Sequence, residues 1–286
     1  MTSSVITITK RAAPRATREL WAGAIIVGLF IALAIAASWF HNQAFVAQPA
    51  SAYLPPAWSA GGSASHLLGT DSLGRDIAAR LLFGIRESVE IAAASVLLAG
   101  TVGVIIGVSA GFFGGWLDAV IMRIADGFLA IPVILLAIGF IGAAGPSLGA
   151  LIGVLAGTQW MFFARVARGE TLVLREQQFI TAQRALGARS GRILFRHVLP
   201  HVLPNALVIA TLNVPVVILL EAGLDFLGLG VQPPTPTLGG MISDGLTSLT
   251  RYPLLAVYPG VVLMVLVVGI NMLGEGIGAL ISGRTV

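Results

Sequence analysis

The sequence predicts an all-α membrane protein with six transmembrane helices and both termini in the cytoplasm. Apolar residues make up 56% of the chain and charged residues only 10%. Arginine is distributed very unevenly between the predicted loops. A bilayer is crossed by about 20 predominantly apolar residues, and the uncharged runs of the chain are long enough for this. These runs are residues 20–40, 91–117, 127–164, 198–220 and 252–274.

The third run must contain two spans. As one helix its 38 residues would be about 57 Å long, against a hydrocarbon core of about 30 Å. The segment "GAAGP" at 142–146 provides the break. The first run could instead be a cleaved signal peptide, but its length exceeds the usual apolar stretch of about 7–15 residues and favours a retained anchor. The predicted spans are therefore 20–40, 88–113, 118–142, 147–166, 202–222 and 253–280.

The basic residues predict the orientation, because they accumulate in cytoplasmic loops. With the N-terminus inside, only Arg75, Arg80, Arg86 and Arg251 of the 17 basic residues lie outside. The chain then divides into a basic tail (1–19), a first helix (20–40), an external segment (41–86) and a five-helix transmembrane domain (87–286) with an arginine-rich loop (167–201). The accumulation of arginine in cytoplasmic loops explains the pI of about 10.3. We expect no nucleic-acid partner, because the sequence has no soluble domain that could form a basic groove.

The arginine-rich loop contains a predicted helix-turn-helix. Apolar or helix-favouring residues recur at helical spacing in its first half, at Phe179, Ala182, Gln183 and Leu186. Gly187 can end this helix in a left-handed conformation, and Ser190 can cap the next helix before Pro200 stops it. The apolar face needs a covering surface. Both the membrane surface and the groove of a partner protein fit this pattern.

Two runs of glycine predict tight helix packing. Small residues at every fourth position let membrane helices approach closely, since lipid provides little hydrophobic drive between them. We expect one packed face on the second span and one on the fourth, either within the chain or against a partner. The glycines are Gly103, Gly107, Gly111 and Gly115, and Gly145, Gly149, Gly153 and Gly157.

Patterns for enzyme chemistry are weak. The segment "HVLPH" at 197–201 has the spacing of a zinc-binding helix, but Val198 replaces its glutamate and Pro200 disrupts the helix. His66, Asp71 and Asp76 could ligate a metal, although capping of a turn and a helix is favoured. The chain has no P-loop, no nucleophile set in a supporting context and no cysteine, so we expect a non-catalytic protein without a metal site.

Polar residues within the spans suggest a translocation path. Ionisable groups in a membrane usually face a cavity or a polar partner, because exposure to lipid is costly. The alternative is an ordinary contact between helices or at a helix end. The candidates are Asp126, Asn213, Glu221 and Asp225. Prolines at 132, 204, 215 and 259 can kink their helices.

Several of these stretches resemble a known family. "FITAQRALGARSGRILFRHVLP" (179–200) is similar to the EAA loop of ABC-importer permeases: Ala182, Gly187 and "VLP" at 198–200 match, whereas Thr181 and Gln183 replace the expected Glu and Ala. Residues 66–84, 111–132 and 222–245 resemble the C-type permease of dipeptide and oligopeptide importers. The likeness extends over nearly the whole chain beyond residue 65.

The resemblance implies a type I ABC importer permease fold in a bacterial inner membrane, forming half of a path for peptides. It also implies a homologous second permease as heterodimer partner, two ATPases that bind ATP and Mg, and an external peptide-binding protein. This chain would hold no cofactor. The alternative cargo is a nickel complex or another peptide-like solute. The competing classes of protein are a self-sufficient secondary transporter and a membrane enzyme. The implied coupling residues are Phe179, Thr181, Ala182, Gln183, Arg184, Leu186, Gly187 and Ala188.

Overall fold

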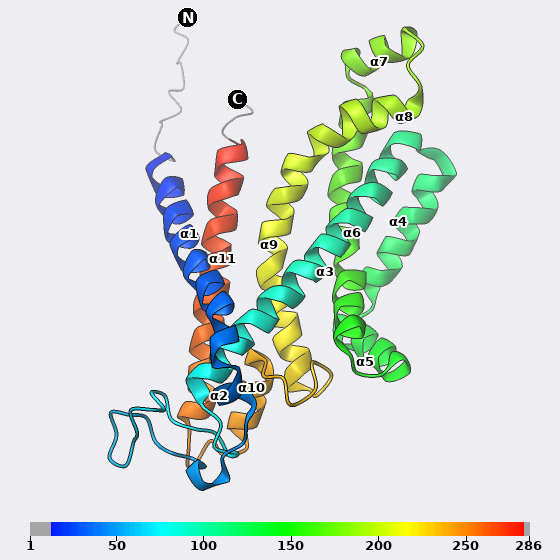
Figure 1. The fold of residues 1–286 in the computed structure, drawn as a ribbon. Coiled ribbons are helices and arrows are strands. Elements are labelled where there is room, and N and C mark those ends of the chain that lie inside the picture. The colour runs from blue at the N-terminus through cyan, green and yellow to red at the C-terminus, as the bar shows by residue number, and fades with distance from the viewer. Residues whose placement is uncertain (1–12, 283–286) are drawn as a thin grey trace, which may run out of the picture.

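The computed structural model describes residues 13–282, which are almost entirely helical (Figure 1). The predicted all-α class is confirmed for this part of the chain. Short 3-10 turns occupy Ala37–Phe40 and Pro49–Ser51, and a π turn occupies Leu194–Val198. The α-helices are α1 (Ala13–Ala36), α2 (His41–Phe45), α3 (Ile77–Phe113), α4 (Gly115–Ala130), α5 (Val133–Ala144), α6 (Leu148–Arg175), α7 (Gln178–Ala185), α8 (Ser190–Ile193), α9 (Leu199–Phe226), α10 (Leu238–Leu246) and α11 (Leu254–Ser282).

Within residues 13–282, five continuous helical segments are long and apolar enough to cross a membrane, and α4 with α5 makes a sixth, broken one. These two helices are bent by 95°, so the span predicted for 118–142 is broken at Pro132, one of the prolines predicted to kink a helix. Ile131 and Pro132 are both extended, with ψ of 126° and 131°. The residue before a proline is disfavoured in helical conformation, which explains the break. Pro204, Pro215 and Pro259, in contrast, lie inside continuous helices.

Two helices are longer than the spans predicted from uncharged runs. Helix α3 begins at Ile77, because Asp76 caps it by accepting a hydrogen bond from the Ala79 amide at 2.8 Å. Its 37 residues correspond to about 55 Å, and it crosses the bundle obliquely (Figure 1). Helix α6 continues past the predicted end at 166 to Arg175. An uncharged run therefore gives only the apolar part of a helix and misses its charged extensions.

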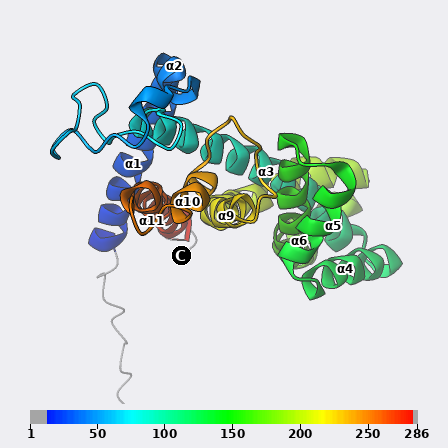
Figure 2. The ribbon, with the colours of Figure 1, turned by 90° about the horizontal axis from the view of Figure 1, so that it is seen from below.

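The helices form a bundle with two distinct ends. Figures 1 and 2 show α1 beside α11, α9 in the middle, and α4 and α5 at the far edge beyond α6. Helix α3 crosses between these groups and packs against both α6 and α9. The first turn of α1, the last turn of α11 and the whole of α7 lie at one end, here called the α7 end. The opposite end carries α2, α10 and the loops around them, and is called the α10 end.

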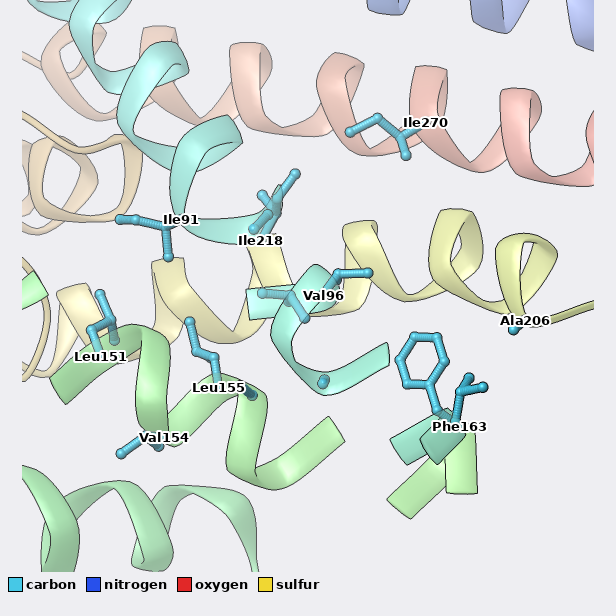
Figure 3. Packing of buried hydrophobic residues seen from close by; sticks show 14 of the residues in the cluster. Ile91, Val96, Leu151, Val154, Leu155, Phe163, Ala206, Ile218 and Ile270 are labelled. Atoms are coloured by element: carbon cyan, nitrogen blue, oxygen red, sulfur yellow. The ribbon is translucent and has the colours of Figure 1, made fainter. Parts of the chain in front are cut away.

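The core lies where α3 passes between α6 and α9. Ile91 of α3, Leu155 and Phe163 of α6, and Ile218 of α9 are all buried there (Figure 3). Glycine brings the two main helices together: a Cβ added at Gly107 would lie 2.2 Å from the Ala164 carbonyl oxygen. Gly103 and Gly111 also meet the α6 backbone or side chains at close range. The packed glycine face predicted for the second span is confirmed at these three positions, whereas Gly115 lies beyond the end of α3 and a Cβ there would meet nothing within 4 Å.

The second glycine run does not pack within this chain. A Cβ added at Gly149 or Gly157 would meet nothing within 4 Å, and one at Gly153 would only touch the Phe140 ring at 3.9 Å. Of the two alternatives predicted for this face, close packing within the chain is not found, and packing against a partner stays a prediction. Helix α6 approaches the glycines of α3 further along the chain, at Trp160, Phe163 and Ala164.

Candidate functional site

Helix α7 projects from the α7 end between α6 and α8 (Figure 1). Ile180 is fully buried and anchors the helix to the bundle. The guanidinium of Arg184 lies over the Phe112 ring of α3, 5.5 Å from its centroid. The Phe179 ring stacks on His201 of α9 at 5.8 Å. These contacts join α7 to both α3 and α9, so a movement of α7 is transmitted directly to two long helices.

The outer face of α7 is exposed. Leu186 has 82% of its surface exposed and Phe179 has 41%, and Ala182 on the same side is exposed as well. Of the apolar row predicted from helical spacing, Ala182 and Leu186 are exposed, whereas Phe179 stacks on His201 and Gln183 is half-buried. The buried anchor, Ile180, was missed because it lies outside that row. Thr181 and Arg184 are exposed, whereas Gln183 and Ala188 are half-buried.

The turn after α7 has the predicted left-handed glycine. Gly187 has φ of +79°, and its amide donates to the Arg184 carbonyl at 2.9 Å. The amide of Ala188 donates to the Gln183 carbonyl at 3.0 Å. This pair of bonds is the Schellman motif, which satisfies carbonyl groups at a helix end. The turn sends the chain back along α8 and so determines the direction in which α7 points.

The segment after this turn differs from the prediction at both ends. Arg189 is the residue preceding α8 and makes no side-chain capping bond, so the cap predicted at Ser190 is wrong. Pro200 does not stop the helix either. It occupies the first turn of α9, where its missing N–H is harmless, and the π turn Leu194–Val198 connects α8 to α9 without a break.

The arginines of the α7 end have two structural roles. Arg168 forms a bidentate pair with Asp118 of α4, and its second bond, from Nη2 to Oδ2, is 2.7 Å. Arg175 donates to the Gly111 carbonyl of α3 at 3.0 Å. These pairs fasten α6 to its neighbours and form a firm base beneath α7. The side chains of Arg189, Arg192 and Arg196 are exposed instead.

The four residues considered for a translocation path are not brought together. Asp126 is exposed and pairs with Arg165 of α6, and Asn213 donates to the Ile209 carbonyl of its own helix at 2.9 Å. Glu221 and Asp225 lie one turn apart near the α10 end of α9, and both are buried. The Ser88 hydroxyl of α3 donates to Glu221 at 3.0 Å, and the Val231 amide donates to Asp225 at 3.0 Å.

Comparison with known proteins identifies the family. Residues 103–286 match the model of the family described as "binding-protein-dependent transport system inner membrane component". The dipeptide transport system permease protein DppC of Alkalihalophilus pseudofirmus is 39% identical over 89% of this chain and 82% of its own length. The oligopeptide permease protein OppC of Bacillus subtilis is 38% identical over 92% and 85%. The nickel permease protein NikC of Escherichia coli is 35% identical over 88% and 90%.

This chain belongs to that permease family. The permease is therefore a multi-pass, non-catalytic component of an inner-membrane transport system. The resemblance seen in the motifs is confirmed. The matched share of the relatives' own length shows that the similarity covers most of the fold.

Within the permease, the residues considered as metal ligands make structural contacts. Asp71 accepts bonds from the Leu73 and Arg75 amides, each at 2.9 Å, as predicted for a capped turn. Asp76 caps α3, and its other oxygen lies 2.8 Å from His66 Nδ1. Helix α10 was missed altogether. Its signal was Thr237, whose hydroxyl accepts a bond from the Gly240 amide at 3.1 Å and so caps the helix.

Proposed function

We propose that this permease forms one half of the translocation path of an ATP-driven peptide importer. Relatives at 37–39% identity are named for the transport of dipeptides, oligopeptides and glutathione, which share a peptide backbone. In this proposal a homologous permease supplies the other half, two ATPases bind ATP and Mg, and an extracytoplasmic binding protein delivers the cargo. The permease itself holds no cofactor.

The exposed face of α7 carries this proposal. An apolar helix face fits a hydrophobic groove on a partner, and Leu186 and Phe179 are the largest side chains of this face. The arginine bias of the loops supports a cytoplasmic position for the α7 end, which is the side where the ATPases of this proposal bind. The coupling residues are those from Phe179 to Ala188, and the contacts of Phe179 with His201 and of Arg184 with Phe112 pass ATPase movement on to α9 and α3.

The open glycine face of α6 suggests where the second permease docks. Gly149, Gly153 and Gly157 lie on one side of α6 and would admit a close helix. Small residues of this kind drive association in lipid because they let two backbones approach. The same face has no use inside this chain, which supports its assignment to a partner.

Nickel is the second candidate cargo, because the nickel permease of Escherichia coli is 35% identical to this chain. A peptide and a chelated nickel ion differ in charge and shape, and the binding protein delivers one or the other. Asp126, Asn213, Glu221 and Asp225 remain our candidates for residues along the path. Of these four, only Glu221 and Asp225 lie one helical turn apart and are both buried, so only they can act together.

The test changes the exposed face of α7 and leaves its anchors unchanged. Leu186→Glu should leave the permease folded, since the side chain is 82% exposed, but should abolish stable co-purification of the ATPases and ATP-dependent dipeptide uptake. Leu186→Met is the matched control and should retain both. Normal ATPase content and uptake in Leu186→Glu would exclude α7 as the coupling element.

A further inference from the structure

A cavity of about 690 Å³ lies at the α10 end of the permease. Its wall comes from segments far apart in the chain: the loop before α3, the first turns of α3, the loop after α9, and α10. Figure 2, which views this end, shows the loop between α9 and α10 reaching over towards α3. The volume is in the range of about 300–1,000 Å³ that is usual for small-molecule sites.

The cavity wall contains a buried arginine without adequate partners. Arg80 is only 5% exposed, and its Nη1 has no hydrogen-bond partner in the part of the chain that the structure describes. Its Nε lies 3.4 Å from Asp71, and its Nη2 lies 4.0 Å from Asp244. A buried guanidinium is costly unless it is paired and hydrogen-bonded, so donors left in this state point to a missing acceptor.

Two arginines and three acids, Asp71, Asp225 and Asp244, line the cavity, but only Asp71 lies closer than 4.0 Å to the Arg80 guanidinium. Arg75 also lines the cavity and holds Asp71 through a 2.7 Å bond, so two guanidinium groups share one close carboxylate. Asp244 is the next nearest acid, but its side chain is 75% exposed and at the limit of ion pairing. The remainder of the wall includes apolar side chains, among them Leu73, Val231 and Met241. This combination suits a carboxylate attached to a small, partly apolar molecule.

We propose that the cavity is a binding site for the free carboxylate of the cargo, with Arg80 as its principal ligand and Arg75 beside it. An arginine fork matches a carboxylate in geometry, and the pair is strongest where water is excluded. Peptides with a free C-terminus carry this group. The inference rests on the proposed function because it takes the cargo to be a peptide.

The test measures binding of a dipeptide to the assembled importer in nanodiscs, without binding protein, by saturation-transfer NMR. Ala-Ala should bind, and Ala-Ala amide, which lacks the carboxylate, should bind at least about tenfold more weakly. Arg80→Gln should weaken Ala-Ala binding by a similar factor and leave the amide unchanged. Asp244→Asn removes a competing acid and should tighten Ala-Ala binding by about two- to fivefold.

Arg86→Gln is the matched control, because Arg86 lies on the same helix but pairs with Glu90 away from the cavity. It should bind Ala-Ala like the wild type. Equal binding of acid and amide by the wild type overturns the proposal and needs no variant to fold. A second result would also overturn it: the Arg80→Gln importer binds Ala-Ala as tightly as the wild type but binds the cargo-free binding protein more weakly. Arg80 would then contact the binding protein and not the cargo. ATP-dependent peptide uptake by the wild type, measured separately, tests the proposed function independently of this site.

Discussion

Replacing Gly187 with valine tests the turn that aims α7. A Cβ at this position would meet nothing within 4 Å, so the change creates no clash with the rest of the permease. Its cost comes from the backbone, since φ is +79° and a left-handed conformation costs an L-residue about 1–2 kcal/mol. Escape to a right-handed conformation would break the two bonds of the turn, at about 0.5–1.5 kcal/mol each. Either route costs about 1–3 kcal/mol.

A penalty of about 1–2 kcal/mol reduces the population of the correctly directed α7 by about 5–30-fold when the loop has a competing conformation. The affinity for the ATPases falls by the same factor, because apparent affinity follows the population of the competent state. The assay titrates purified ATPases onto the permease pair in nanodiscs and then measures dipeptide uptake in proteoliposomes. Gly187→Asn is the control, since asparagine tolerates the left-handed region, and it should remain close to wild type. Wild-type affinity and uptake in Gly187→Val would refute the coupling role of this turn.

The remaining predictions concern packing and topology. Gly107→Ala should destabilise the permease by about 1–3 kcal/mol, because the new Cβ would lie 2.2 Å from the Ala164 carbonyl oxygen. Gly157→Ala on α6 should be neutral or stabilising in the isolated chain, since nothing lies within 4 Å of the added Cβ and alanine favours helix. Thermal unfolding in detergent compares the Gly107→Ala and Gly157→Ala variants. Equal melting temperatures of these variants would contradict the packing described. The chain has no cysteine, so Ser65→Cys and Ser190→Cys provide single labels. An impermeant thiol reagent should label position 65 in intact cells and position 190 only after permeabilisation, and the reverse pattern would invert the topology.

The helical class, the number of apolar segments and the local turns could all be predicted from the sequence. The length of an apolar run against bilayer thickness predicts a span without knowledge of any neighbour. The left-handed Gly187 and the caps at Asp71 and Asp76 are equally local, because each depends on bonds to residues a few positions away. Helix α7, for which we propose a coupling role, could be located for the same reason. Its function was indicated by resemblance to a family.

Long-range packing decided the rest. Both glycine runs have the same spacing, but only that of α3 meets another helix backbone of this chain at close range, and the spacing alone does not say which surface lies opposite. Ile180 is buried because α7 folds back onto the bundle, a direction that the period of the helix does not contain. The cavity at the α10 end needs Arg80 and the loop after α9, which are separated by four spans and meet only in the folded permease. Helical periodicity and capping act over a few residues, whereas a site depends on which distant segments the chain brings together.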